Sequence, residues 1–313
     1  MRLFAMAFLA LAAAAQDRAT VTEPPPEAAL GGTLLGAPLS HENLTIYFLE
    51  DPRAKSLGDW ITLEEGLRGG KLRVSENRPA RVNELLVQNG STQPCFLQAG
   101  DVVKGGQQDR AIGADAVVPP RSGRVPVRTF CVEQGRWSSG ASGFGTTTGM
   151  VVGARLRAAI QNDKDQSKVW AAVEKAKADL VQANALRASS STSLNEQLLD
   201  RKVRERLDGF LTALGKACEK RERAVGLVTA INGKPAVADL YADPGLFRKL
   251  YPRLLAAAAI EAMSVPPKAS KAPSPAELAK LLRSADAKSG KGAPLQFRFR
   301  HGDVELHRQV LLH

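Results

Sequence analysis

The feature that most constrains the fold is a series of short strand-like segments between residues 84 and 131. Residues 84–88, 95–97, 116–118 and 125–131 are mostly apolar or β-branched, and Asn-Gly, Ala-Gly, Gly-Gly and Pro-Pro pairs lie between them. Short apolar segments bounded by turn residues are typical of β-strands. The alternation from residue 81 to residue 131 therefore favours an antiparallel, sandwich-like arrangement in the N-terminal half of the chain.

Helical spacing replaces this pattern in the second half. Apolar residues there recur every three or four positions, as on the buried face of a helix. The two clearest faces are Val169, Val173 and Leu180, and Val203, Leu207, Phe210, Leu214 and Cys218. Asn232-Gly233 predicts a β-hairpin, and residues 296–300 and 304–312 predict another at the C-terminus. Strands, then helices, then strands again predict an α+β protein.

Two local signals predict where helices begin in the C-terminal part. Asp243 followed by Pro244 is typical of a helix cap and a first helical residue. Ser274 with Glu277 three residues later has the spacing of a capping box. Helices are therefore expected to start at residues 244 and 275.

The N-terminal segment has the layout of a secretory signal peptide. Arg2 precedes an apolar run over residues 3–11, and alanines occupy residues 13–15. The run is shorter than the roughly 20 residues of a membrane-spanning helix, and a retained anchor is the alternative to cleavage. We therefore expect a signal peptide over residues 1–15 and a soluble mature protein that is periplasmic or secreted.

One domain is expected after the signal peptide. Residues 16–40 are rich in Pro, Ala and Gly and predict a loose lead-in. Residues 41–313 predict a single α+β domain with a β-rich part at 41–137 and a helix-rich part at 150–313. Residues 138–148, rich in Gly, Ser and Thr, predict a connecting loop. No transmembrane segment is expected after signal cleavage.

Positive charge is concentrated in the second half of the chain. The formal net charge is +11. Residues 16–150 hold 14 Lys or Arg against 15 Asp or Glu, whereas residues 151–313 hold 28 against 17. The excess, prominent at residues 216–223, is typical of solvated helix faces but also suits an acidic cell-envelope partner. Nucleic acid is not favoured, because only 5% of residues are aromatic and could stack on bases.

The three cysteines are an odd number for a protein expected in an oxidising compartment. Cys95 and Cys131 lie in strand-like segments and could form a disulfide if these strands are neighbours. Cys218 continues an apolar helix face and is predicted to be a buried thiol. The four histidines lack metal-type spacing, so no metal site is predicted. His301 and His307, beside the C-terminal hairpin turn, are expected at the surface.

Two polar clusters, at residues 104–110 and 133–137, follow the ends of predicted strands. Function often lies where the strands of a rigid sheet end. The Gly-Gly pair of the first cluster lets the backbone approach an anion, and the basic side chains of both could pair with phosphate or carboxylate. The tryptophan could stack on a planar group. The residues predicted to bind a ligand are Lys104, Gly105, Gly106, Gln108, Arg110, Gln134, Arg136 and Trp137.

The same clusters hold two candidates for catalysis. Asp109 and Glu133 could act as acid and base, or bind a divalent cation through oxygen. The structural alternative is that both carboxylates form salt bridges with the neighbouring arginines, that the Gly-Gly pair is a plain turn and that the tryptophan covers the core. No nucleophile–base pair is recognisable, and no particular cofactor is indicated.

Several of these segments together resemble a known bacterial family. They are HENLTIYFLE at residues 41–50, the segments 84–110 and 125–137 with their GGQQDR and CVEQGRW motifs, and the later INGK hairpin. The chain is similar in these segments to the ARG-and-rhodanese-phosphatase-superfamily-associated protein domain family, from about residue 38 to the end. The resemblance implies a single α+β domain and a role near ADP-ribose or NAD-derived metabolites, but no established activity.

These observations leave two hypotheses. The first is an exported binding or scaffold module whose polar clusters line a site for an anionic small molecule or a cell-envelope partner. The alternative is a hydrolase or processing enzyme that acts on a phosphorylated or ADP-ribose-like substrate. The predicted export is a departure from what the family implies, because ADP-ribose pathways are expected in the cytoplasm.

Overall fold

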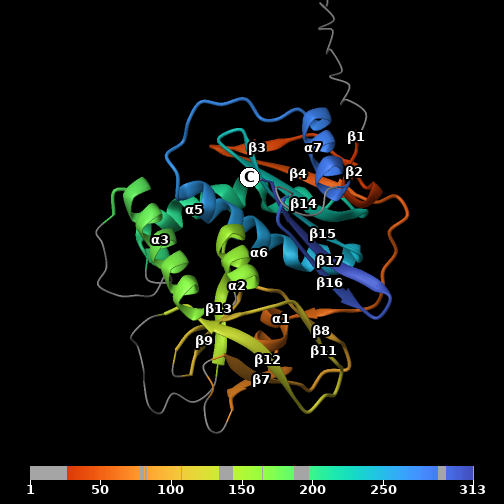
Figure 1. The fold of residues 1–313 in the computed structure, drawn as a ribbon, viewed down its shortest axis with the longest axis vertical. Coiled ribbons are helices and arrows are strands. Elements are labelled where there is room, and N and C mark those ends of the chain that lie inside the picture. Colours follow the sequence, from red (N-terminus) through yellow and green to blue (C-terminus); the bar gives the residue numbers. More distant parts are fainter. Residues whose placement is uncertain are drawn as a thin grey trace, which may run out of the picture.

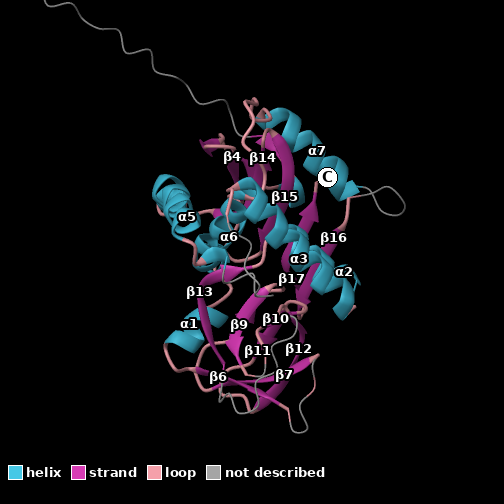
Figure 2. Cartoon of the chain, turned by 90° about the vertical axis from the view of Figure 1, so that its left-hand side faces the viewer, coloured by secondary structure: helices cyan, strands magenta, loops and turns pink. Residues whose placement is uncertain are grey.

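The structure is a computed structural model. It describes residues 27–77, 81, 83–106, 108–133, 144–163, 165–186, 197–287 and 294–312. The fold is α+β, as the sequence predicts, and antiparallel pairing dominates its sheets (Figures 1 and 2).

An eight-stranded sheet brings the two ends of the described chain together. Its order is β1 (Glu27–Ala28), β2 (Leu34–Leu35), β4 (Leu44–Glu50), β14 (Ala224–Ile231), β15 (Lys234–Tyr241), β17 (Val304–Leu311) and β16 (Gln296–His301), and β3 (Leu39–His41) also pairs with β4. Residues 27–40 are thus not a loose lead-in. They form short edge strands and a 3-10 turn, η1 (Leu30–Gly32), and the side chains of Leu30 and Leu35 are fully buried.

Helices cover both faces of this sheet. Alternate residues of β4 face opposite ways: Ile46 and Phe48 pack with α6 (Pro244–Met263) and α5 (Arg201–Leu214), whereas Tyr47 and Leu49 pack with α7 (Pro275–Ala287). Burial on both faces explains why β4 is apolar without alternation. In Figure 1, α7 lies at the top and α6 lies between the sheet and the lower part of the molecule.

A second layer of β structure lies below α6. The six-stranded sheet has the order β13 (Phe144–Val151), β9 (Asp101–Gly105), β10 (Arg110–Ile112), β12 (Arg124–Cys131), β7 (Glu84–Asn89) and β6 (Leu72–Glu76). A three-stranded sheet has the order β11 (Ala116–Val118), β8 (Cys95–Leu97) and β5 (Ile61–Thr62). The two sheets share one apolar core, so this half is sandwich-like as predicted. The edge strands β13 and β6 also lie against each other, so the larger sheet curls.

The remaining helices attach to these layers. α1 (Leu63–Arg68) follows β5, whereas α2 (Ala154–Asp163) and α3 (Gln166–Ala183) pack on the outer face of the six-stranded sheet. A second 3-10 turn, η2 (Gly215–Cys218), follows α5. The predicted loop at residues 138–148 differs from the structure where it is described, because residues 144–148 belong to β13 and residues 144–146 pair with β9.

The short-range signals agree with the structure. The side chain of Asp243 accepts a hydrogen bond from the Leu246 N–H and caps α6. Ser274 and Glu277 form their capping box at the start of α7. Asn232 and Gly233 have positive φ angles of 50° and 72°, as the tight turn between β14 and β15 requires.

Candidate functional site

The first polar cluster occupies the hairpin turn between β9 and β10. β10 also pairs with β12, and Arg110 lies directly opposite Cys131. The end of β12 therefore comes beside the turn, and the structure brings Glu133 of the second cluster next to Asp109: the Asp109 N–H lies 3.4 Å from Glu133 Oε2. Gln134, Arg136 and Trp137 lie outside the described residues.

Gly106 shapes this turn. Its φ is 57°, and a Cβ atom at this position would lie 2.2 Å from the Phe144 ring. Only glycine fits under that ring without displacing it. Gly105 precedes it with a φ of 124°, and its N–H donates to Asp109 Oδ1 at 3.1 Å. The Gly-Gly pair therefore makes a turn that the Asp109 carboxylate closes.

Arg110 points into the core of the curled sheet. Its side chain is on the same face as Ile112 and is 1% exposed. Its Nη1 donates to the backbone oxygen of Gln108 at 3.1 Å and lies 3.4 Å from Gln108 Oε1. Its Nη2 lies 3.9 Å from Glu76 Oε1, which is a long ion pair. Among the described residues its Nε–H has no hydrogen-bond acceptor.

The two candidate catalytic carboxylates both accept main-chain hydrogen bonds. Asp109 Oδ1 accepts from Gly105, and Glu133 Oε2 accepts from Asp109. The backbone oxygen of Asp109 in turn accepts from the Val132 N–H at 3.1 Å. The carboxylates thus hold the turn against the end of β12, beside the buried guanidinium.

Cys131 does not resemble an activated nucleophile. Burial raises the pKa of its thiol, and the positive charge of Arg110 offsets this only in part. Its backbone N–H donates to Gln166 Oε1 at 2.9 Å, and its carbonyl accepts from Gln166 Nε2 at 2.8 Å. Gln166, the first residue of α3, therefore attaches the helix to the site.

The structure contains no bridge between Cys95 and Cys131. All three cysteines are free and buried. Cys95 lies in β8, which pairs with β11 and β5, whereas β12, which carries Cys131, pairs with β10 and β7. The strands belong to different sheets, so the condition for the proposed disulfide is not met. Cys218 is buried in the core beside α5, as predicted.

A second polar centre, which the sequence analysis did not find, lies between the two β layers. His307 was expected at the surface, but it is 2% exposed. Its Nδ1 lies 2.5 Å from Asp115 Oδ2, and its Nε2 lies 3.2 Å from Asp239 Oδ1. Arg157 of α2 donates to both oxygens of Asp239, at 3.0 and 2.7 Å. We call Asp115, His307, Asp239 and Arg157 the ionic network.

The ionic network fixes the charge of its members. Burial alone would lower the pKa of His307, but the carboxylates of Asp115 and Asp239 raise it to about 9. Burial alone would raise the pKa of Asp239, but Arg157 and His307 lower it to about 2. At neutral pH both groups are therefore charged. The Tyr241 ring stacks on His307, with ring centroids 4.4 Å apart.

One sequence signal could have found this centre. Asp239 interrupts the apolar run of residues 236–240, and a charge in a buried strand needs a partner. The register places Tyr241 opposite His307 and Asp239 opposite Gln309. The identity of the partners depends on α2 and on the loop before β11, which the local pattern does not reveal.

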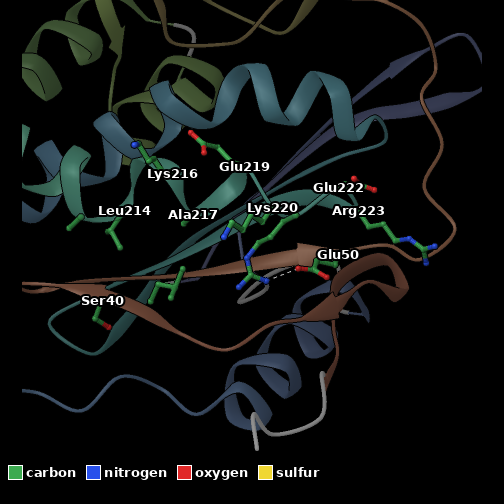
Figure 3. Close-up of a pocket in the computed structure, with 12 residues that line it drawn as sticks. Ser40, Glu50, Leu214, Lys216, Ala217, Glu219, Lys220, Glu222 and Arg223 are labelled. Atoms are coloured by element: carbon green, nitrogen blue, oxygen red, sulfur yellow. Dashed lines mark hydrogen bonds and ion pairs between the residues drawn. The ribbon is translucent and has the colours of Figure 1, made fainter. Parts of the chain in front are cut away.

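The basic segment at residues 216–223 lines an open groove of about 1010 Å³ between α5, η2, β3 and the C-terminal end of β4 (Figure 3). Arg221 already has partners in this groove. It pairs with Glu50 at 2.7 Å, and its guanidinium lies over the Phe48 ring, 4.9 Å from the ring centroid. Glu219 and Glu222 lie among the remaining cations, so the groove has a mixed charge. Its character fits a solvated surface more closely than a dedicated anion site.

Two further features are absent from the part of the chain that the structure describes. Within the described residues, no group of three or more His, Cys, Asp or Glu side chains is placed to hold a metal ion. No helix in the same part of the chain combines the length and apolar character needed to cross a bilayer.

Comparison with known proteins identifies the family. The model of the ARG and Rhodanese-Phosphatase-superfamily-associated Protein domain matches residues 33–313, and the chain therefore belongs to this family. A search of curated proteins and a search of solved structures each found no match.

Proposed function

We propose that this protein is a binding module that recognises the anionic group of a small molecule through Arg110. The observation that carries the proposal is the incomplete pairing of a buried guanidinium. Arg110 is 1% exposed, its Nε–H has no acceptor among the described residues, and its carboxylate partner Glu76 is 3.9 Å away. A buried cation normally has close partners, because burial removes its hydration.

A phosphate suits this arrangement. A guanidinium presents several N–H donors in one plane and binds phosphate or carboxylate with two parallel hydrogen bonds. Glu76 is 19% exposed, so the guanidinium lies just below the surface at this point. A ligand oxygen would replace the long Glu76 contact. Lys104 is exposed and follows Val103, the residue paired with Arg110, so its side chain is on the other face of β9.

The family description favours a particular ligand class. It names ARG and the rhodanese-phosphatase superfamily as associated proteins. A phosphorylated or ADP-ribose-like small molecule is therefore the first ligand to test at Arg110.

A thermal-shift series tests the proposal. The probes are ADP-ribose, ribose 5-phosphate and inorganic phosphate, each with wild type, Arg110→Ala, Arg110→Lys and Arg73→Ala. Arg73 is an exposed arginine on β6 of the same sheet and serves as the matched control. A ligand at 100 times its Kd stabilises the folded state by about 2.7 kcal/mol, which is several degrees in Tm.

The expected result is a ligand-induced shift that is kept in Arg73→Ala, reduced in Arg110→Lys and lost in Arg110→Ala. Cooperative melting of every variant without ligand is the folding control. An equal shift in wild type and in a folded Arg110→Ala protein would place the anion elsewhere. The absence of a thermal shift of the wild type with all three probes would contradict this ligand class.

A hydrolase acting on the same ligand class is the second candidate. It is favoured by the position of Asp109 and Glu133 at the turn next to Arg110, where the Glu133 carboxylate lies 3.4 Å from the Asp109 N–H. In this case Arg110 would hold the anionic group, and the carboxylates would serve as acid and base.

Export is also part of the proposal. It is supported by the basic start, the apolar run and the alanines of residues 1–15. Expression of the full chain in a bacterial host, followed by N-terminal sequencing of the periplasmic fraction, tests it. A mature N-terminus near Gln16 supports export, and an intact protein confined to the cytoplasm would refute it.

A further inference from the structure

A small pocket lies between α2, α3 and the C-terminal end of α6, and the Arg110 site does not include it. Its volume is about 160 Å³. The apolar residues that line it are Leu156, Ala172, Ala176, Ile231, Ile260 and Val265. An apolar protein cavity of about 150 Å³ can hold one benzene molecule. The pocket therefore has room for a group of about six to eight non-hydrogen atoms.

One carboxylate, that of Glu261, lies in this apolar wall. Its Oε1 accepts a hydrogen bond from the Arg155 N–H at 2.9 Å, in the first turn of α2. No described residue donates a hydrogen bond to Oε2, and no ion pair of the described chain includes Glu261. Burial raises the pKa of this carboxyl, against the opposing effect of Arg155. Glu261 thus lines the pocket and has one carboxylate oxygen without a partner among the described residues.

Gly153 makes room for this carboxylate. A Cβ atom on Gly153 would lie 2.5 Å from Glu261 Oε1 and 2.8 Å from its Cδ. The absence of a side chain therefore lets Glu261 reach the start of α2 and face the pocket. At the rim, Lys175 and Asp179 pair with each other at 3.1 Å and largely cancel each other's charge.

We propose that this pocket binds a small hydrophobic amine, whose apolar part packs between α2, α3 and α6 and whose ammonium group pairs with Glu261 Oε2. The residues that line the pocket favour a hydrophobic amine over other small molecules. The apolar lining favours a hydrocarbon group, and the carboxylate favours a cation and repels an acid of the same shape.

Binding of three probes of one shape tests the proposal. Benzylamine, benzyl alcohol and benzoate differ at a single substituent, and their binding to the full chain can be measured by ligand-observed NMR and calorimetry. The variants are Glu261→Gln, which keeps an oxygen for the Arg155 N–H, and Ala176→Phe, which fills the pocket. Lys202→Ala, at an exposed residue of α5 that does not line the pocket, is the control.

Benzylamine is expected to bind wild type and Lys202→Ala at least tenfold more tightly than benzoate. Glu261→Gln is expected to weaken benzylamine at least tenfold and to leave benzyl alcohol nearly unchanged. Ala176→Phe is expected to abolish both. Equal benzylamine affinity in wild type and Glu261→Gln would overturn the proposal, as would benzoate binding as tightly as benzylamine or no binding of benzylamine by wild type.

Discussion

The described part of the chain contains three buried arginines, and two of them, Arg157 and Arg110, differ in how fully they are paired. Arg157 donates to both oxygens of Asp239, which also contacts His307, and His307 contacts Asp115. Arg110 contacts the backbone oxygen and the side-chain amide oxygen of Gln108, and it lies 3.9 Å from the Glu76 carboxylate. Its Nε–H has no acceptor among the described residues. The first arrangement is complete, so it stabilises the fold. The second has hydrogen-bonding capacity left for a ligand.

The two centres also differ in what they connect. The ionic network joins β15, β17, α2 and the loop before β11, so it links the eight-stranded sheet with the second β layer. A second buried ion pair, Arg253 with Asp101 at 2.6 Å, makes a similar link from α6 to β9. The Arg110 site belongs to one hairpin and the strands beside it. Its disturbance should therefore be local, whereas loss of the ionic network should affect the whole fold.

The largest effect is expected from Asp239→Ala. This change leaves Arg157 and His307 buried, positively charged and without their shared carboxylate. Removal of one partner of a buried ion pair typically costs about 3–5 kcal/mol. Urea unfolding followed by circular dichroism measures the loss.

The control for that measurement is Glu205→Ala. Glu205 and its partner Arg201 form an exposed ion pair on α5, and such pairs contribute about 0–1 kcal/mol. An Asp239→Ala protein that is as stable as Glu205→Ala would show that the ionic network does not stabilise the fold. The proposed difference between a stabilising Arg157 and a ligand-binding Arg110 would then have no support.

The next largest effect concerns pH. The pKa of His307 is about 9 in the folded protein and 6.5 ordinarily, so its protonated form favours folding. This contribution is fully present below about pH 6.5 and is lost as pH rises through 9. The shift corresponds to about 3 kcal/mol at most. His307→Gln should remove this part of the pH dependence.

The measurement is the free energy of unfolding at pH 6, 8 and 10 for both proteins. Other groups titrate in the same range, but they are common to the two, so the difference between the curves isolates His307. The wild-type advantage should shrink from pH 6 to pH 10. A constant difference would mean that the pKa of His307 is the same in the folded and the unfolded protein.

The ionic network also shows which features of the structure cannot be predicted from the sequence. The caps at Asp243 and Ser274 and the turn at Asn232-Gly233 follow from residues a few positions apart, and they are predictable. The environment of His307 is not, because its neighbours in sequence form an exposed turn at Gly302 while its partners are about 70 to 190 residues away. Local pattern gives the elements, whereas tertiary packing decides which polar residue in them is buried.

The Arg110 site could be predicted from the sequence in part. Its location at a strand end follows from the Gly-Gly turn, and the pairing of β10 with β12 brings Glu133 to it. The burial of the Arg110 side chain could not be predicted. It depends on the curl of the six-stranded sheet, which brings the end of β6 and its Glu76 across to β10.

A direct comparison of Arg110→Ala with Arg157→Ala sharpens the contrast. Arg157→Ala leaves Asp239 buried without a guanidinium and should cost about 3–5 kcal/mol. Arg110→Ala should cost about 1–2 kcal/mol, because Glu76 is partly exposed and keeps water. Chemical denaturation without ligand measures both. Equal losses would mean that Arg110 is a structural cation, and the binding proposal would lose its basis.

The smallest effect on stability is expected from Glu133→Gln, and it separates the two candidate functions. A glutamine oxygen can still accept the Asp109 N–H, so the free energy of unfolding should change by less than about 1 kcal/mol. In a binding module, ADP-ribose stays intact with wild type and variant alike, with or without Mg²⁺, and its affinity changes little. In a hydrolase, wild type consumes the ligand and the variant binds it without turnover, because an amide cannot transfer the proton. Chromatography of the ligand after incubation distinguishes these outcomes, and turnover by wild type that Glu133→Gln abolishes would make Arg110 the anion clamp of an active site.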